Sequence, residues 1–380
     1  MTRMAQNFDI CIRGSGIVGK TLALLLARDR QRVALVPHPG PQNPAATDVR
    51  AYALNMASRR LLESLRSWPD AQHATAVLQM DVRGDQNGAV KFDASTQNVD
   101  ALAWIVDVPA LEARLTEAVR FQPQVEVVSS PVAAPLTVVC EGRASSTRAE
   151  FGVDFKITPY GQTAIATRLH TELPHGQVAR QWFSPEGILA FLPLDGPGGN
   201  SVAVVWSVMH DQAAPLMALD AEAFAEKLKA ASHGALGTLA LCADRAAWPL
   251  QLATADRWCG QSPGSGASRR SWVLAGDAAH NVHPLAGQGL NLGLADVAVL
   301  ADVLHRRDYW RSVADLKLLR RYERERKAAV LTMGLTTDGL AQLFARQEGP
   351  VQMLRNWGMK GFEHSGPLKA FVARQAMGMY

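Results

Sequence analysis

The first forty residues of the chain carry two short apolar runs separated by a glycine-rich segment. Residues 8–13 form an apolar run typical of a buried strand, and an apolar segment of helix length follows at residues 17–29. Residues 32–36 are β-branched in part, so a second strand is expected there. A strand, a glycine turn, a helix and a strand in this order predict a βαβ unit.

Beyond this unit the pattern changes. Between residues 160 and 208, apolar runs alternate with turn residues, which predicts an antiparallel sheet. Helices are expected at 57–67, at 111–119, in a segment ending near 305 and from about 315 onward with a break at 349–350; strands are expected at 79–82, 88–92, within 125–140 and at 272–275. The predicted fold class is α/β, with an α+β second domain that holds the antiparallel sheet.

Composition and charge exclude several classes of protein. Hydrophobic residues make up 48% and charged residues 19% of the 380 residues, which is typical of a globular protein and excludes disordered and fibrous chains. The 39 basic and 35 acidic residues give a net charge of +4, and the pairs Arg269-Arg270 and Arg320-Arg321 are too short for a nucleic-acid patch. Nucleic acid is not expected as a partner.

Four cysteines stand far apart in the chain, at Cys11, Cys140, Cys242 and Cys259. None belongs to a CxxC pair or has histidines at zinc spacing, so we expect buried or free thiols in a reducing compartment and no metal site. The longest aliphatic run, residues 22–27, is far shorter than the ~18 residues of a membrane span. With no signal-peptide pattern at the N-terminus, a cytoplasmic location is expected.

Three glycines occupy the turn of the predicted βαβ unit. Gly14, Gly16 and Gly19 fit the pattern GxGxxG. In that pattern the first glycine permits a tight turn, the second admits a pyrophosphate to the backbone, and the third lets helix and strand pack closely. This context favours dinucleotide binding, with an ordinary glycine-rich turn as the alternative.

Two positions near this turn depart from the dinucleotide pattern. The second strand ends in Pro37-His38, where a carboxylate for a ribose hydroxyl is usual, and the next carboxylate is Asp48. Arg13 stands directly before the first glycine, where an aliphatic side chain is usual. Arg13 either pairs with a phosphate or is solvated, and the sequence leaves both alternatives open.

A second glycine-rich segment follows the strand expected at residues 272–275. Gly276 and Asp277 end this strand, and the Asp277 carboxylate suits a ribitol or ribose hydroxyl. A turn rich in proline and glycine then leads into the next helix. The N–H groups from Gly287 to Leu290 are expected to face an anionic ring edge or a phosphate.

With these two motifs the chain resembles the flavin-dependent aromatic hydroxylases of the para-hydroxybenzoate hydroxylase type. Within them it is similar to the ubiquinone-biosynthesis hydroxylases, the UbiH/UbiF/VisC group. The resemblance covers nearly the whole chain and includes Tyr160-Gly161-Gln162-Thr163-Ala164, Pro174-His175, residues 182–187, Leu192-Pro193-Leu194, Leu354-Arg355-Asn356-Trp357-Gly358 and Ala376-Met377-Gly378.

The resemblance implies a class A flavoprotein monooxygenase with FAD as cofactor, NAD(P)H as electron donor and O2 as the oxidant. In this class, reduced FAD reacts with oxygen to give a C4a-hydroperoxide that hydroxylates an electron-rich ring. The protein supplies binding, orientation and exclusion of water. No catalytic side chain is assigned, and His280 and His283 are either structural or involved in proton transfer.

A discontinuous division of the chain is expected from these motifs. Residues 1–78, 97–150 and 265–314 form a Rossmann-like FAD-binding domain, residues 79–96 and 151–264 a substrate domain, and residues 315–380 a C-terminal helical region. The predicted cofactor-binding residues are Gly14, Gly16, Gly19, Arg50, Gly142, Gly276, Asp277, Pro284, Gly287, Gln288, Gly289, Leu290 and Asn291. Phe191, Pro193 and Trp206 are candidates for lining the substrate.

Departures from the family pattern concentrate on the ADP half of the cofactor site. The family motif Asp-Gly-x-x-Ser-x-x-Arg begins with Glu141 here, followed by Gly142, Ser145 and Arg148 at the expected spacing. Pro109 stands about where the family has an arginine that contacts the FAD phosphates. Each lost charge-assisted hydrogen bond costs about 1.5–3 kcal/mol, so weak retention of FAD during purification is predicted.

Three functions stay open at this point. The first is hydroxylation of a polyprenylated phenol or quinone precursor on the way to ubiquinone. The second is a non-catalytic or weakly FAD-binding subunit or regulator of a ubiquinone-biosynthesis complex, and the third is hydroxylation of a soluble aromatic compound. A prenylated substrate implies contact with the inner-membrane surface, for which the apolar and basic residues of 353–380 are suited. The same residues suit a partner groove or domain packing, and a homo-oligomer is a further possible assembly.

Overall fold

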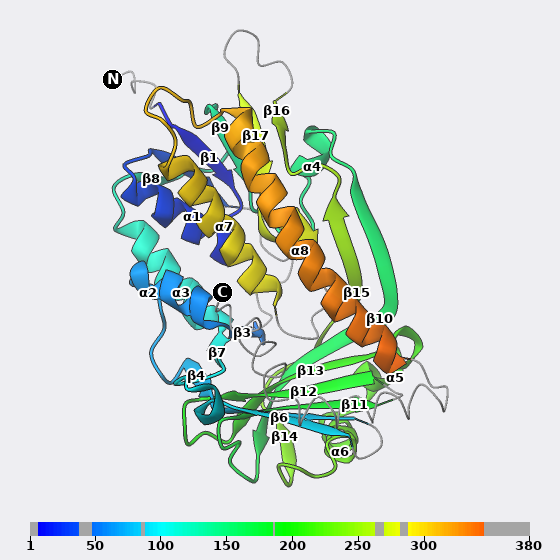
Figure 1. The fold of residues 1–380 in the computed structure, drawn as a ribbon. Helices are drawn as coiled ribbons and strands as arrows, with labels where there is room; N and C mark the ends of the chain where they lie inside the picture. The colour runs from blue at the N-terminus through cyan, green and yellow to red at the C-terminus, as the bar shows by residue number, and fades with distance from the viewer. Residues whose placement is uncertain are drawn as a thin grey trace.

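Two large β-sheets and one small sheet organise the chain in the computed structural model (Figure 1). The structure describes residues 7–37, 48–84, 88–184, 187–262, 270–281 and 288–345. In Figure 1, helices gather around the first sheet in the upper half of the view. Most strands of the second sheet lie in the lower half, and β10 and β15 extend upward along the right side.

The first sheet has six strands in the order β16-β17-β9-β1-β2-β8, and all neighbours except β16 and β17 run parallel. The strands are β1 (Ile10–Arg13), β2 (Val33–Val36), β8 (Val125–Val127), β9 (Leu136–Val139), β16 (Cys259–Gln261) and β17 (Ser271–Leu274). Only β9 separates β1 from β17, so the two glycine-rich turns leave the sheet at the same edge. Ligands of open parallel sheets bind at this carboxyl edge.

Four helices pack around the parallel sheet: α1 (Ile17–Arg28), α3 (Val108–Arg120), α7 (Gly289–His305) and α8 (Leu316–Ala345). Helix α1 contacts both α3 and α7, and α8 lies along α7 (Figure 1). The βαβ unit and the two C-terminal helices are confirmed. Helix α3 begins three residues earlier than predicted, because Pro109 lies in its first turn, where a missing N–H breaks no hydrogen bond.

The second sheet is largely antiparallel, as the alternation of residues 160–208 predicts. Its main order is β18-β15-β10-β13-β12-β11-β5-β6, with β14 also paired to β10, and only β11 and β5 run parallel. The strands are β5 (Gln79–Arg83), β6 (Ala89–Asp93), β10 (Phe155–Thr171), β11 (Val178–Ser184), β12 (Gly187–Leu194), β13 (Ser201–Met209), β14 (Leu239–Leu241), β15 (Ala246–Ala255) and β18 (His280–Asn281).

A three-stranded sheet lies between the two large ones. It consists of β3 (Ala51–Leu54), β7 (Ala103–Asp107) and β4 (Ala74–Val77). Val77 and Ile105 of this sheet pack against Ala179, Leu194 and Ala203 of the antiparallel sheet in one apolar cluster. The small sheet therefore joins the two large layers through side-chain packing.

Several shorter elements complete the fold. They are α2 (Met56–Ser64), η1 (Ser95–Gln97), α4 (Thr147–Glu150), α5 (His210–Ala218), α6 (Ala221–Ala231) and η2 (Gly276–Ala278). Helix α6 was not predicted, and its Phe224 and Leu228 cover one face of the antiparallel sheet. Among the described residues, no helix is both long and apolar enough to cross a membrane. The predicted break at 349–350 lies outside the described residues.

Candidate FAD site

The first glycine turn is packed against backbone on two sides. Gly14 has a φ of +109°, and a Cβ atom at this residue would lie 2.3 Å from the carbonyl oxygen of Cys140. A Cβ atom on Gly19 would lie 1.9 Å from the carbonyl oxygen of Gly14. Any side chain at either position collides with backbone atoms, so the tight packing of α1 on β1 and β9 requires both glycines.

Gly16 differs from its two neighbours because the space beside it is open. No described atom lies within 4 Å of the position a Cβ atom would take. Gly16 is the N-cap of α1, and no side chain of the described residues caps this 12-residue helix. Uncapped N–H groups at the positive end of a helix attract anions. The residues present therefore fit the diphosphate of a dinucleotide such as FAD.

The second glycine turn packs directly on α1 and α7. Gly276 has a φ of +62°, and a Cβ atom there would contact Val18 of α1 at 3.4 Å. A Cβ atom on Gly293 of α7 would lie 2.9 Å from Cγ2 of the same valine. The two glycines bring the turn and both helices together, which places the two glycine motifs side by side.

Asp277 follows in the short helix η2 and is half-buried. Burial raises the pKa of this carboxyl, against the opposing charges of His280 and Arg143. No residue of the described chain donates a hydrogen bond to it. A half-buried carboxylate without a protein donor suits the hydroxyl groups of a ribityl chain, as the sequence predicts.

A buried carboxylate holds the second turn in place. Oδ2 of Asp296 in α7 accepts hydrogen bonds from the Gly276 N–H at 2.9 Å and from His280 Nε2 at 2.7 Å. Its Oδ1 accepts from Nε of Arg326 in α8 at 2.7 Å. The side chains of Asp296, His280 and Arg326 are 0%, 2% and 8% exposed. These three residues, the Asp296 network, tie the turn to α7 and α8.

The Asp296 network is ionic despite its burial. Burial raises the pKa of Asp296, but His280 and Arg326 outweigh it and hold that pKa below its ordinary value. The ring of His280 also stacks on Trp258, with centroids 4.9 Å apart. The structure therefore places His280 in a structural network, while His283 lies outside the described residues. Sequence reasoning missed Asp296 and Arg326, which carry no motif of their own.

The start of α7 holds the remaining predicted residues, of which Pro284 and Gly287 lie outside the described residues. Gln288 is the N-cap of α7, followed by Gly289 and Leu290, and no side chain caps the helix among the described residues. Asn291 donates to the Ala53 carbonyl oxygen at 2.8 Å and accepts from the Ser58 hydroxyl at 2.7 Å. The Asn291 side chain therefore joins α7 to β3 and α2.

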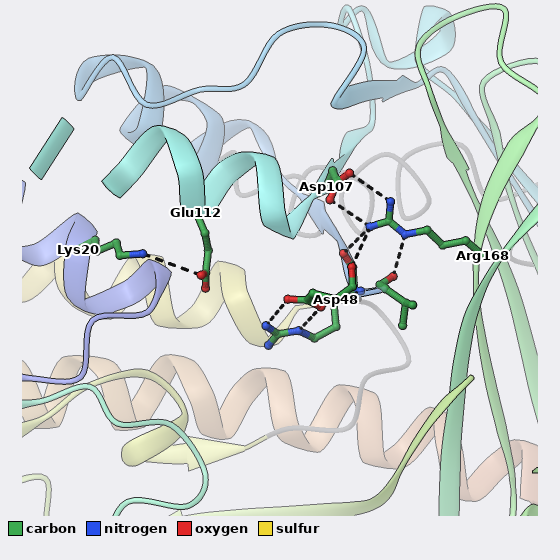
Figure 2. A network of polar contacts seen from close by, with 7 residues as sticks. Lys20, Asp48, Asp107, Glu112 and Arg168 are labelled. Carbon is green, nitrogen blue, oxygen red and sulfur yellow. Dashed lines mark hydrogen bonds and ion pairs between the residues drawn. The ribbon is translucent and has the colours of Figure 1, made fainter. Parts of the chain in front are cut away.

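Arg50 and Arg168 form a polar network at the junction of the sheets (Figure 2). Arg50 donates from Nε and Nη2 to the two carboxylate oxygens of Asp48, at 2.8 and 2.6 Å. Arg168 of β10 pairs with both oxygens of Asp107, at 3.2 and 3.0 Å, and also donates to the carbonyl oxygens of Asp48, Val49 and Arg50. Arg168 thereby fixes the segment that carries Arg50.

Arg13 and Glu141 compensate one another. Nε of Arg13 lies 3.2 Å from Oε1 of Glu141, and its Nη2 donates to Glu150 at 2.9 Å. Glu141 also accepts from the hydroxyls of Ser145 and Thr147, at 2.7 and 2.6 Å. Arg13 is therefore paired with protein carboxylates, and neither of the two alternatives left open by the sequence describes it. Gly142 follows with a φ of +78° in the turn that Glu141 stabilises.

The three residues predicted to line the substrate lie on the face of the antiparallel sheet that α6 covers. Phe191 and Trp206 belong to the cluster that includes Phe224, and Pro193 pairs with Val202 of the same cluster. The opposite face carries Arg168 and packs on the three-stranded sheet. The candidates and the predicted flavin motifs are therefore on different sides of this sheet.

Comparison with known proteins agrees with this geometry. The family described as FAD binding domain matches residues 106–334, more than half of the chain. A protein named ubiquinone hydroxylase UbiL from Rhodospirillum rubrum is 32% identical over 97% of this chain and 89% of its own length. A 3-demethoxyubiquinol 3-hydroxylase from Escherichia coli is 30% identical over 98% of this chain and 99% of its own length.

Solved structures share the fold. The p-nitrophenol 4-monooxygenase PnpA from Pseudomonas putida has a TM-score of 0.77 at 18% identity, and covers 98% of this chain and 99% of its own. A probable FAD-dependent monooxygenase, pqsL from Pseudomonas aeruginosa, has a TM-score of 0.73 at 23% identity, over 94% of this chain and 100% of its own. These structures support the fold, while the family match and the two ubiquinone-pathway relatives show that the chain belongs to the FAD-dependent ubiquinone-biosynthesis hydroxylases.

Proposed function

We propose that this protein hydroxylates the aromatic ring of a polyprenylated phenol or quinone precursor during ubiquinone biosynthesis. The observation that carries the proposal is the second glycine turn, in which Gly276 and Asp277 are anchored by the buried Asp296 network. Similarity along nearly the whole chain to two proteins named as ubiquinone-pathway hydroxylases supports the choice of substrate class. The proposed electron donor is NAD(P)H, and the proposed oxidant is O2.

Residues from three elements would hold FAD. The diphosphate would lie at the N-terminus of α1 beside Gly16, where the space is open. The Asp277 carboxylate would accept hydrogen bonds from hydroxyl groups of the ribityl chain. The backbone from Gln288 to Leu290 would face the edge of the flavin ring. Arg50 is exposed enough to reach the cofactor while it keeps its pair with Asp48. When bound and reduced, FAD would supply the oxygen-activating chemistry, while the protein would orient the substrate and exclude water.

We propose that the ring of the substrate lies over a row of small side chains on the antiparallel sheet. Ala190 and Val205 are register partners, as are Val205 and Ala166, so the three lie next to one another across β12, β13 and β10. They lie on the same face as Arg168, because strand residues two apart share a face. The row Ala166, Ala190 and Val205, the small-residue platform, consists of short side chains that suit a planar ring. It replaces Phe191, Pro193 and Trp206 as the proposed substrate contact.

We propose that the enzyme lies in the cytoplasm at the surface of the inner membrane, because its proposed substrate is soluble in the membrane. A second candidate function, a subunit or regulator of a ubiquinone-biosynthesis complex with weak FAD binding, is favoured by one observation. Pro109 lies in the first turn of α3, about where the family has an arginine that contacts the FAD phosphates, so the ADP half lacks that charge. Membrane contact, the complex and a homo-oligomer all belong to these proposals.

The absorption spectrum of the purified protein, before and after titration with FAD, separates the two functions. A perturbed bound-flavin spectrum, together with oxygen uptake that requires NADH or NADPH and a prenylated phenol, supports the hydroxylase. Because the ADP contacts are reduced, we expect FAD to be lost in part during gel filtration and restored on titration. An unchanged spectrum at high FAD concentration would contradict the hydroxylase function and favour the function as a subunit or regulator.

The platform has its own test. Ala190→Leu fills the space above β12, so we expect a raised KM for the prenylated phenol with an unchanged flavin spectrum. Ala240→Leu, at an exposed position of β14 in the same sheet, is the control and should leave both unchanged. Equal KM values for both variants would contradict the assignment of the platform.

A further inference from the structure

Lys20 is a cation in the first turn of α1. Its N–H donates to the Gly16 carbonyl oxygen at 2.9 Å, so the residue is one helical turn from the open diphosphate position. Its side chain is only 12% exposed. Long side chains on helices lean toward the N-terminus, which directs the ammonium of Lys20 toward the end of α1 that carries Gly16.

This location is unfavourable for an ammonium without an anion. The positive end of α1 repels a cation, and burial removes the hydration of the charge. Burial lowers the pKa of Lys20, with the charge of Glu112 opposing. Sequence choices that are locally unfavourable concentrate at functional sites.

Glu112 of α3 only partly balances this charge. Its Oε2 lies 3.9 Å from Nζ of Lys20, beyond hydrogen-bond distance, and it is 38% exposed (Figure 2). Within the described chain, no residue accepts a hydrogen bond from Lys20 Nζ. Glu112 also lies close enough to Arg50 to add to the rise in the pKa of that guanidinium, which the Asp48 pair mainly causes. Glu112 thus lies near two cations: Arg50, which is already paired with Asp48, and Lys20, which is not hydrogen-bonded to a carboxylate of the described residues.

We propose that Lys20 binds the diphosphate of FAD. In the absence of FAD, the Glu112 carboxylate serves as the counter-charge near Lys20 and Arg50, and the diphosphate takes over this role when it binds. The inference rests on the proposed FAD-dependent function. Pro109 precedes Glu112 by three residues on α3, so Lys20 delivers from α1 the positive charge that α3 does not provide. A phosphate oxygen at hydrogen-bond distance satisfies the ammonium better than a carboxylate at 3.9 Å.

Titration of the flavin-free full-length protein with FAD, ADP and riboflavin tests this assignment. Lys20→Met should weaken FAD and ADP binding by about 10- to 100-fold, the loss of one charge-assisted hydrogen bond, and leave riboflavin binding unchanged. It should also flatten the dependence of FAD affinity on salt. Lys20→Arg should restore most of the affinity. Glu112→Gln should tighten FAD and ADP binding by about 3- to 10-fold, because it removes a competing anion.

A matched pair on α6 provides the control. Lys229 and Glu226 are also 3.9 Å apart but lie on the surface, so Lys229→Met and Glu226→Gln should change neither affinity. Equal FAD affinity of Lys20→Met and the wild type overturns the inference and leaves the proposed function intact, as does an equal loss of riboflavin binding, which indicates a structural role. Should Lys20→Met fail to fold, Glu112→Gln decides alone, and unchanged or weaker FAD binding overturns the inference. Absence of FAD binding by the wild type overturns the proposed function itself.

Discussion

The two ends of the proposed FAD site are held in different ways. At the flavin-ring end, one carboxylate receives the Gly276 N–H, His280 and Arg326, and all three side chains of the Asp296 network are buried. At the ADP end, two ion pairs each have one exposed carboxylate. Glu150 is 53% exposed in its pair with Arg13, and Glu112 is 38% exposed beside Lys20.

The difference indicates how each end of the site keeps its geometry when no ligand is bound. A buried and fully paired ionic network keeps its geometry without a ligand, because each partner would lose its only counter-charge on moving. Exposed ion pairs contribute little to the free energy of folding, so they can exchange partners with a small change in free energy. The flavin-ring end is therefore preorganised, while the ADP end changes its charge partners with the cofactor.

The largest expected effect comes from breaking the preorganised end. Asp296→Asn leaves the buried guanidinium of Arg326 without a counter-charge, so the free energy of unfolding should fall by about 3–5 kcal/mol. Urea denaturation followed by circular dichroism measures it. Asp302→Asn on the same helix breaks only the exposed pair with Arg306 and should cost about 0.5 kcal/mol or less. Similar losses in the two variants would remove the distinction between the ends.

Substitutions within the first glycine turn separate folding from binding. Gly19→Ala drives a methyl group into the Gly14 carbonyl oxygen and should cost about 1–3 kcal/mol of stability. Gly16→Ala meets open space, so stability should stay the same while FAD affinity falls, because the methyl group enters the diphosphate position. Thermal melts and FAD titration of both variants test this. Full FAD affinity in Gly16→Ala would place the diphosphate elsewhere.

The smallest effect is expected at Glu141, and it depends on pH. Burial raises the pKa of Glu141, but Thr147, Ser145 and Arg13 outweigh it and hold that pKa below its ordinary value of 4.5. A lowered folded-state pKa means that the stabilisation is present above about pH 4.5 and is lost as the pH falls through the lower folded value.

Glu141→Gln should therefore lower the free energy of unfolding by about 1–2 kcal/mol at pH 7. The difference from the wild type should shrink as the pH falls below 4.5. Urea midpoints at a series of pH values check the trend. A difference that is constant down to pH 3, or that grows there, would show that the carboxylate charge does not carry the effect.

The sequence was sufficient for the elements with a clear period or motif. The βαβ unit, the alternating strands of residues 160–208 and helix α7 are in the predicted places. The strands Ala51–Leu54 and Ala74–Val77 were missed because four-residue segments rich in alanine carry little periodicity. Helix α6 had a usable signal, since Asp220 caps it by accepting from the Ala223 N–H.

The contacts within the site were harder to predict from the sequence. Arg326 and Asp296 stand thirty residues apart on two helices, and only the packing of α8 on α7 brings them together. Arg13 and Glu141 each departed from the family pattern, and their mutual compensation required the neighbouring positions of β1 and β9. Which face of β12 and β13 packs on the three-stranded sheet also depends on tertiary packing, and the sequence does not show it. The predicted substrate contacts Phe191, Pro193 and Trp206 lie on the opposite face.

The two-residue strand β18 connects the flavin turn to the other half of the molecule. His280 and Asn281 follow the turn after β17 and pair at once with Thr254 and Ala253 of β15. This short segment thus leads directly from the end of a strand of the first sheet into the second sheet. Because of this link, a tilt of the second sheet would displace the flavin turn. Relatives with this fold should therefore change their substrate through larger or smaller side chains on the second sheet, with the backbone kept in place.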